Sequence, residues 1–212
     1  MRSTARRVLE ALRLRVYYQI ATRGPLREDG WLRSLEDQSC VDAAGRPLPW
    51  LTYPAIEFLS ARVRPGMRVF EYGAGNSTLW WAARVEEVVS CEHDRGWYDA
   101  IAPRVPANVM LRHVALEYGG AYCRVVSEFR DAFDLVVVDG RDRVNCAIHA
   151  VPALRPDGVL VWDNSDRDEY RAGYEFLAAQ GFRKLPFIGL APMINQKNET
   201  GIFYRDHNCL GL

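Results

Sequence analysis

The stretch VFEYGAGNSTLWWA, residues 69–82, decides the fold. An apolar run ends in a turn with glycine at positions 73 and 75, and an apolar segment of helical character follows. Glycines let the backbone approach a ligand closely, and the start of the next helix offers free N–H donors. In an α/β sheet this arrangement predicts a ligand site at the carboxyl end of the first strand.

Length and composition narrow the class of protein. The chain has 212 residues, the size of one α/β domain, and equal numbers of basic and acidic residues, 27 each, so no global charge attracts nucleic acid. No apolar run is long enough to span a membrane, and the N-terminus lacks the continuous apolar stretch of a signal peptide. Five cysteines without a C-x-x-C pair argue against a disulfide scaffold or a zinc site. We therefore expect a cytoplasmic protein.

The N-terminal region predicts helices and loops. Residues 4–22 show apolar side chains at helical spacing among several arginines, which predicts a basic amphipathic helix. We expect it to cap the core with its arginines in solvent; contact with an acidic partner or a membrane surface is the alternative. Loops rich in glycine and proline surround a short helix near residues 31–35, and Pro54 suits the first turn of another. We expect residues 1–66 to form a helical extension and substrate-side cap on a core of residues 67–212, in one structural domain.

From residue 67, strand-like and helix-like segments alternate. The expected strands cover residues 67–72, 85–92, 108–116, 133–140 and 158–164, and the expected helices cover residues 77–85, 94–105 and 144–154. Apolar strands that alternate with helices predict a parallel sheet covered on both faces. The last two strand-like runs, 182–192 and 198–206, have no helix between them and predict a closing antiparallel hairpin.

Two acidic residues define the ligand further. Glu71 stands beside the glycine turn, where it would repel a pyrophosphate and favour a cationic ligand. The dinucleotide fingerprint G-x-G-x-x-G is incomplete, because Thr78 occupies its third glycine position. Glu92 ends the second strand, where an acidic residue binds ribose hydroxyls. S-adenosylmethionine, with a ribose, a positive centre and no phosphate, fits both carboxylates. An ordinary Rossmann-like domain with coincidental carboxylates is the alternative.

The successive strand-end motifs FEYGAGNST, VVSCEHD, FDLVVVDG and LRPDGVLVWDN resemble those of class I S-adenosylmethionine-dependent methyltransferases. The resemblance covers residues 67–164 and implies a Rossmann-like sheet. It also implies the cofactor-binding residues: Glu71, Gly73, Gly75, Asn76, Ser77, Glu92, His93, Trp97 and Asp139. In this arrangement Glu71 and the glycines surround the methionine end, Glu92 binds the ribose, and His93 and Trp97 flank the adenine.

A narrower resemblance concerns the ends of the fourth and fifth strands. Asp139, Asp163 and Asn164 resemble the metal set of the caffeoyl-CoA and catechol O-methyltransferases, which implies a divalent ion, Mg²⁺ or Ca²⁺, that stabilises a substrate oxyanion. The sequence departs from that family at Asp142, where those enzymes carry a lysine. The base therefore has no matching residue. A strand-end turn with a helix cap is the alternative interpretation of Asp163 and Asn164.

Residues near these strand ends are candidates for catalysis and substrate binding. The candidate catalytic residues are Asp139, Arg141 and Asp163, and three side chains are expected to line the acceptor pocket: Trp50, Tyr53 and Arg143. Arginines after the fourth strand can bind a carboxylate or phosphate of the acceptor; exposed charge without this role is the alternative. For the two aromatic residues, which lie in a proline-framed loop, the alternative is core packing.

These features together predict an S-adenosylmethionine-dependent methyltransferase. We expect a small or medium polar acceptor, since no basic patch interleaved with aromatic residues points to nucleic acid. O-methylation is the first interpretation, and N-methylation stays open. Three alternatives remain: a non-catalytic binding or interaction protein of the same fold, an aminopropyl transferase that takes the decarboxylated cofactor, and a nicotinamide-dependent oxidoreductase.

Overall fold

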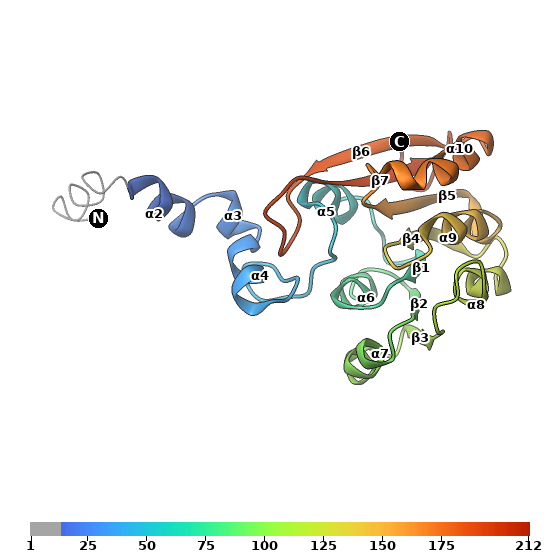
Figure 1. Ribbon diagram of the computed structural model, residues 1–212, viewed down its shortest axis with the longest axis horizontal. Coiled ribbons are helices and arrows are strands. Elements are labelled where there is room, and N and C mark those ends of the chain that lie inside the picture. The colour runs from blue at the N-terminus through green and yellow to red at the C-terminus, as the bar shows by residue number, and fades with distance from the viewer. Residues whose placement is uncertain (1–13) are drawn as a thin grey trace.

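The computed structural model describes residues 14–212. It begins with three helices, α2 (Arg15–Thr22), α3 (Pro25–Glu28) and α4 (Trp31–Asp37) (Figure 1). The part of the expected N-terminal helix before residue 14 lies outside the described residues. Helix α3 lies before residues 31–35, where a loop rich in glycine and proline was predicted, because Pro25 suits the first turn of a helix. In the described chain no helix is long and apolar enough to cross a membrane.

A seven-stranded sheet forms the centre of the molecule, with strand order β3-β2-β1-β4-β5-β7-β6. The strands are β1 (Arg68–Tyr72), β2 (Glu87–Glu92), β3 (Val109–His113), β4 (Phe133–Val138), β5 (Leu154–Asp163), β6 (Arg183–Gly189) and β7 (Asn198–Tyr204). Strands β1 to β5 pair in parallel, and β7 pairs antiparallel with both β5 and β6. The predicted Rossmann-like sheet with a closing antiparallel hairpin is confirmed.

Helices connect the strands and cover the sheet. They are α5 (Tyr53–Ser60), α6 (Asn76–Ala82), α7 (Arg95–Ile101), α8 (Ala121–Arg124), α9 (Arg143–Ala150) and α10 (Arg171–Ala179). Short 3-10 segments add η1 (Ala102–Arg104), η2 (Val125–Glu128), η3 (Val151–Ala153) and η4 (Asp168–Tyr170). Helix α8 was not predicted, since a single turn is too short to show helical periodicity.

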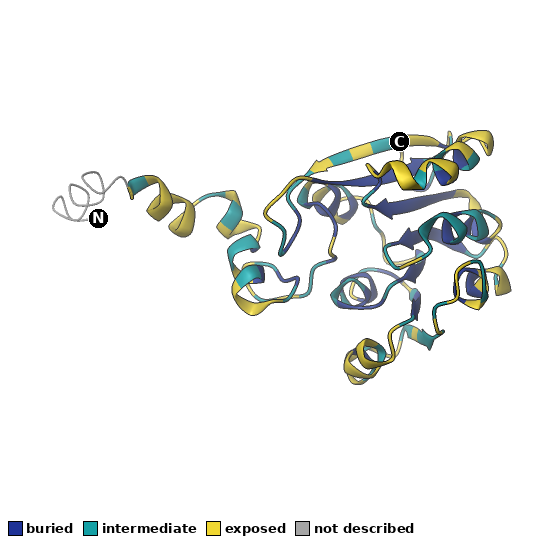
Figure 2. Ribbon diagram, in the orientation of Figure 1, coloured by how far each residue is buried: buried dark blue, intermediate teal, exposed yellow. Residues whose placement is uncertain are grey.

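The core lies in two layers on opposite faces of the sheet. In β4, Val136 and Val138 face the layer built with α8, α9 and α10, whereas Leu135 and Val137 face the layer built with α5 and α6. Side chains alternate along a strand, so a strand buried on both faces reads as a continuous apolar run. Figure 2 shows these central strands as buried, while α2 at the edge of the molecule is largely exposed.

The register of the parallel strands brings the carboxyl ends together. Tyr72 of β1 pairs with Cys91 of β2 and with Val138 of β4, and Val138 pairs with Trp162 of β5. The residue after each of these comes to the same edge of the sheet: Gly73, Glu92, Asp139 and Asp163. The fold thus gathers the strand-end motifs in one place, as open α/β sheets do.

A close contact between α10 and β5 offers a test of this packing. A Cβ atom added at Gly173 would lie 2.4 Å from Cη2 of the fully buried Trp162. Overpacking of this kind costs about 1–3 kcal/mol, more than the 0.5–1 kcal/mol that alanine gains over glycine in a helix. We expect Gly173→Ala to lower the free energy of unfolding by about 1–2 kcal/mol, measured by urea denaturation.

The matched control is Gly66→Ala, because a Cβ atom there meets nothing within 4 Å. Its free energy of unfolding should stay within about 0.5 kcal/mol of the wild-type value. A Gly173→Ala protein as stable as the control would show that α10 does not press on Trp162.

Candidate functional site

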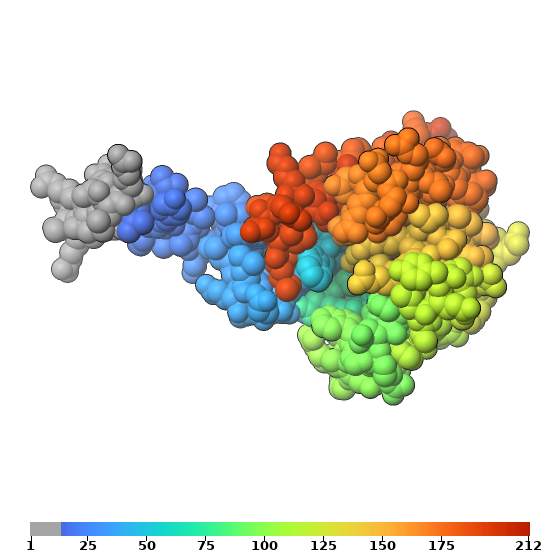
Figure 3. All heavy atoms as spheres, viewed as in Figure 1, coloured from blue at the N-terminus to red at the C-terminus, as the bar shows by residue number. Residues whose placement is uncertain are grey.

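A cavity of about 1130 Å³ opens at the carboxyl edge of the sheet. Strand ends form its floor, and residues from the segments 38–50 and 193–194 contribute to its walls. In Figure 3 the connection between β6 and β7 lies beside α4 and the segment that follows it. The predicted site residues that line the cavity are Trp50, Gly73, Gly75, Asn76, Ser77, Glu92, His93, Trp97, Asp139, Arg141, Arg143, Asp163 and Asn164.

The glycine turn after β1 brings two loops together. Gly73 has φ +94°, a conformation that side chains disfavour, and an added Cβ atom would lie 3.2 Å from the backbone of Gly140. At Gly75, an added Cβ atom would lie 3.5 Å from Nε1 of Trp97, an ordinary contact. Contacts within the protein therefore require glycine at position 73 but not at position 75.

Glu71 lies beneath this turn and does not line the cavity. Its side chain is buried and accepts hydrogen bonds from Ser90 Oγ at 2.9 Å and from Thr78 Oγ1. Burial raises the pKa of Glu71 to about 7, although hydrogen bonds from Thr78, Ser77 and Ser90 oppose the shift. Glu71 thus ties β1 to β2 and to the start of α6. This corrects the expectation that it contacts the methionine end of a ligand.

Glu92 holds two loops and still faces the cavity. Its Oε1 accepts hydrogen bonds from the backbone N–H groups of His93 and Asp94, both at 2.8 Å, and its Oε2 accepts one from Ala74 at 2.9 Å. A carboxylate has about four acceptor positions. Oε2 accepts only the hydrogen bond from Ala74 within the described residues, which leaves one position for a hydroxyl group, although the Glu92 side chain is only 5% exposed.

The aromatic residues expected at the site have different surroundings. Trp50 is 48% exposed and Trp97 is 56% exposed, and both line the cavity. Trp97 also donates a hydrogen bond from Nε1 to the carbonyl oxygen of Ala74 in the glycine turn. Tyr53 instead packs against the core layer on the α5 side, so the expectation that it lines the pocket is corrected.

Part of the cavity wall was not predicted from sequence. Asn76 Nδ2 donates to Ser39 Oγ at 2.9 Å and to the carbonyl of Cys40 at 2.8 Å, and Trp31 Nε1 donates to the carbonyl of Ile194 at 2.7 Å. The lining residues missed are Gln38, Ser39, Cys40, Leu48, Ala74, Asp94, Ala100, Ile101, Arg104, Tyr118, Gly140, Asp142, Val144, Arg167, Glu169, Tyr170, Met193 and Ile194. Half of them lie in loops outside the strand-end motifs and six lie in helical segments, where the sequence carries no signal of a site; Ala74, Asp94 and Gly140 lie within the motifs themselves.

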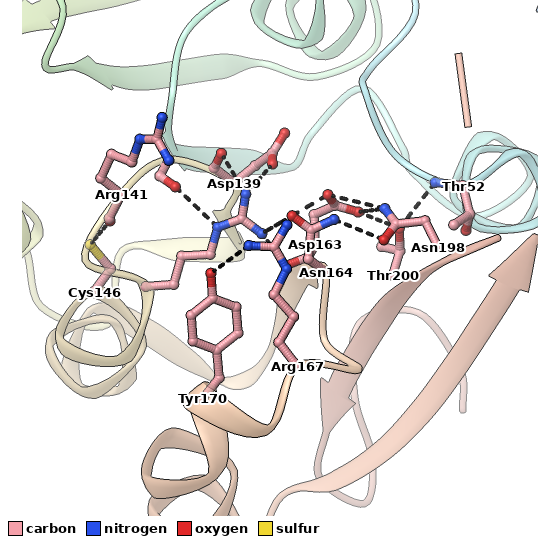
Figure 4. Close-up of polar contacts among 12 residues, drawn as sticks. Thr52, Asp139, Arg141, Cys146, Asp163, Asn164, Arg167, Tyr170, Asn198 and Thr200 are labelled. Atoms are coloured by element: carbon pink, nitrogen blue, oxygen red, sulfur yellow. Dashed lines mark hydrogen bonds and ion pairs between the residues drawn. The ribbon is translucent and has the colours of Figure 1, made fainter. Parts of the chain in front are cut away.

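Asp139, Asp163 and Asn164 do come together (Figure 4). The guanidinium group of Arg143 lies among them. Arg143 donates to Asp139 Oδ1 at 3.1 Å and to Asn164 Oδ1 at 2.9 Å, and its Nη1 lies 4.0 Å from Asp163 Oδ2. Arg143, which was expected to line the acceptor pocket, therefore donates its hydrogen bonds to other groups of the protein.

Asp163 is held from the other side by β7. Its Oδ1 accepts hydrogen bonds from Thr200 Oγ1 at 2.9 Å and from Asn198 Nδ2 at 3.3 Å (Figure 4). Asn164 Nδ2 donates to Asn198 Oδ1 at 2.8 Å. The next helical segments begin only at Asp168, so Asp163 and Asn164 form the turn after β5 without capping a helix.

The two aspartates differ in how far a ligand can reach them. The side chain of Asp139 is 22% exposed and that of Asp163 is 5% exposed. Burial, followed by the nearby Asp163, raises the pKa of Asp139 well above its usual range, and Arg143 opposes the shift. Burial also raises the pKa of Asp163, again opposed first by Arg143. Asp139 is the carboxylate of this cluster that the cavity makes accessible.

The residues do not fit a divalent ion. Within residues 14–212 no group of three or more histidine, cysteine, aspartate or glutamate side chains is placed to hold a metal. The three expected ligands surround a guanidinium group instead. Asp142, in the position of the family's lysine, accepts hydrogen bonds at 2.8 Å from the backbone of Gly119 and from Asn145 Nδ2, so it has a structural task.

Comparison with known proteins identifies the family. Residues 70–165, which contain the glycine turn, Glu92 and the Arg143 cluster, match the family model described as "Methyltransferase domain". This segment is a methyltransferase domain. No curated protein matches this methyltransferase.

Solved structures share the fold at low sequence identity. A methyltransferase from Geobacter sulfurreducens has a TM-score of 0.54 and 18% identity, over 92% of this chain and 96% of the other. A precorrin 8W decarboxylase from Methanobacterium thermoautotrophicum has a TM-score of 0.56 and 16% identity, over 80% and 97%. Spermidine synthase from Thermotoga maritima has a TM-score of 0.53 and 13% identity, over 70% and 56%. These likenesses show the fold of the methyltransferase.

The raised pKa of Glu71 predicts how stability depends on pH. Its folded-state pKa of about 7 exceeds the ordinary value of 4.5, so the folded methyltransferase binds this proton more tightly than the unfolded chain. The resulting stabilisation is complete below the ordinary value and is lost as the pH rises through about 7. At pH 8 the ionised carboxylate costs up to about 3 kcal/mol.

Glu71→Gln keeps an acceptor for Thr78 and Ser90 and carries no charge. We expect it to be more stable than wild type at pH 8, by up to about 3 kcal/mol, and to lose this advantage at pH 5. Urea denaturation of the unliganded protein at both pH values measures the difference, and exposed Glu86→Gln controls for the loss of one acidic residue. An equal difference at pH 5 and pH 8 would rule out the titration of Glu71 as its cause.

Proposed function

We propose that this methyltransferase transfers the methyl group of S-adenosylmethionine to a hydroxyl oxygen of a small or medium polar acceptor. The observation that carries the proposal is a pair of carboxylates in one cavity, at the ends of β2 and β4, the strands on either side of β1. Glu92 keeps an open acceptor position for the cofactor, and Asp139 is accessible in the same cavity without a metal ion.

The cavity suits S-adenosylmethionine. The open position on Glu92 Oε2 can accept a hydrogen bond from a ribose hydroxyl, and the turn at Gly73 and Gly75 leaves space for a close approach. His93 and Trp97 follow Glu92 in the chain and line the same wall, which suits the adenine. The cavity exceeds the usual size of a pocket for one small ligand, so an acceptor can bind beside the cofactor.

The bound cofactor supplies an electrophilic methyl group on a sulfonium. The protein has to align the acceptor oxygen with that methyl group, and good alignment can supply about 7–11 kcal/mol. As the new bond from oxygen to carbon would form, the bond from the methyl carbon to the sulfur would break with its electron pair staying on sulfur, S-adenosylhomocysteine would leave, and the carboxylate of Asp139 would accept the proton that the hydroxyl loses. Arg143 and Asp163 position this carboxylate. No step in this scheme needs a divalent ion.

Arg141 favours an acceptor with a negative charge. Its side chain is exposed, lines the cavity and forms no ion pair with any part of the described chain. A guanidinium group in this state can bind a carboxylate or phosphate with paired hydrogen bonds. The polyamine acceptor of an aminopropyl transferase would instead meet a like charge. Residues of segment 38–50 also line the cavity, which supports a role for the region before β1 as a substrate-side cap.

The first test is calorimetric titration with S-adenosylmethionine, its decarboxylated form and S-adenosylhomocysteine. Tighter binding of the decarboxylated form would favour the aminopropyl transferase. Tight binding of a nicotinamide dinucleotide, with no binding of these ligands, would favour the oxidoreductase. Methyl transfer to any acceptor would exclude a protein that only binds.

Glu92→Ala tests the ribose contact. It removes a hydrogen bond to a charged acceptor, and we expect S-adenosylhomocysteine to bind about 10- to 100-fold more weakly by calorimetry. Glu87→Ala, at the other end of β2, is the matched control and should retain the wild-type affinity. Wild-type affinity in Glu92→Ala would place the ribose elsewhere.

Asp139→Asn tests the proton acceptor. The amide keeps an oxygen that can accept from Arg143 but cannot take a proton at neutral pH. We expect kcat for a hydroxyl acceptor to fall about 100-fold or more, with S-adenosylhomocysteine affinity changed by less than about threefold. Radiolabelled methyl transfer and calorimetry measure the two quantities. Unchanged kcat would assign the proton to another group.

A further inference from the structure

The guanidinium group of Arg143 is fully used by the protein. Nε donates to the carbonyl of Gly140 at 3.0 Å, and Nη1 donates to Asn164 Oδ1 at 2.9 Å and to the carbonyl of Asp163. Nη2 donates to the carbonyl and to Oδ1 of Asp139, at 3.2 and 3.1 Å. A guanidinium group has five N–H donors, so none remains for an acceptor molecule. The side chain is only 11% exposed.

The oxygens around Arg143 are the ones expected to hold a divalent ion. Mg²⁺ and Ca²⁺ need carboxylate or amide oxygens at about 2.0–2.6 Å. An ion at that distance from Asp139 Oδ1 and Asn164 Oδ1 would lie close to the guanidinium nitrogens that already bind both atoms. Like charges a few ångström apart in a partly buried site repel strongly. The guanidinium group and a metal ion therefore exclude each other.

We propose that Arg143 is the resident cation of this site and takes the place of a divalent metal ion among Asp139, Asp163 and Asn164. Arg143 is a positioning residue, because it orients the Asp139 carboxylate and joins the ends of β4 and β5 without touching the acceptor. Its catalytic meaning rests on the methyl transfer proposed above, but the occupancy of the site can be measured without turnover.

The local backbone aims Arg143 at this position. Asp142 before it has φ 51°, and hydrogen bonds from Gly119 and Asn145 hold its side chain, so the turn after β4 is fixed where α9 begins. Tyr170 lies alongside, with its ring centroid 5.9 Å from the guanidinium carbon of Arg143. Arg141, two residues earlier, has no such support and is exposed. The two arginines therefore have separate tasks, one inside the site and one facing the acceptor.

The proposal limits how an acceptor can bind. A divalent ion can hold two neighbouring acceptor oxygens in its coordination sphere, whereas a guanidinium group without free donors cannot. Orientation of the acceptor must then come from cavity groups with unused donors, such as Arg141. An acceptor with a single hydroxyl and a separate anionic group fits this site better than one that needs chelation.

Titration with Mn²⁺, followed by the electron paramagnetic resonance signal of the free ion, tests the proposal. Wild type should show no Mn²⁺ site with a Kd below about 1 mM. Arg143→Ala and Arg143→Gln should each gain one site, with affinity at least about tenfold higher than wild type. Adding Asp163→Asn to Arg143→Ala should remove that site. Arg141→Ala, the matched control, should behave as wild type.

Two results would overturn the proposal. One is a wild-type site with a Kd below about 1 mM that Asp163→Asn abolishes, because the ion would then coexist with Arg143. The other is a folded Arg143 variant, verified by circular dichroism, that gains no Mn²⁺ affinity. If both Arg143 variants fail to fold, the comparison of wild type with Asp163→Asn decides. Failure of S-adenosylmethionine to bind would overturn the proposed function and leave these ion measurements untouched.

Discussion

Burying a carboxylate is costly unless hydrogen bonds or an opposite charge compensate it, and four neighbouring strand ends of this sheet carry one. Three different solutions appear at this edge. Glu71 accepts hydrogen bonds from hydroxyl groups, and Glu92 accepts them from backbone N–H groups. Asp139 and Asp163 both lie beside the guanidinium group of Arg143. Each solution also joins two strands or a strand and a helix. The edge that forms the cavity is therefore held by polar cross-links at each of these strand ends.

The acceptor positions that each carboxylate leaves free distinguish the structural residues from those that can contact a ligand. Glu71 lies below the turn and Asp163 is surrounded by β7 and Arg143, so both have structural tasks. Glu92 keeps one acceptor position and Asp139 keeps an exposed edge, so both can meet a ligand. Four acidic residues near one edge of the sheet thus divide into two pairs, and the division follows from their hydrogen bonds.

The sequence predicted the sheet well because apolar runs and their connections constrain topology strongly. It also placed Gly73, Glu92, Asp139 and Asp163 at one edge, since parallel strands end together. The sequence did not predict the direction in which individual side chains point. Glu71 points beneath the turn and Tyr53 packs into the core, and neither direction is encoded in local spacing. The walls from segments 38–50 and 193–194 depend on contacts between residues far apart in the chain.

The departures from the metal-dependent pattern are physically linked. With a divalent ion, both aspartates would be ligands held in the ionised form, and the base would have to be a separate residue such as the lysine of that family. A guanidinium group carries one positive charge, and the two carboxylates carry two negative charges. The cluster therefore keeps one net negative charge, and one of its carboxylates can take a proton. Asp139, the more exposed member, is the natural place for it. Two departures, Arg143 in place of an ion and Asp142 in place of a lysine, thus agree with one proposed change of mechanism. A metal ion with a separate base is replaced by a carboxylate that an arginine positions.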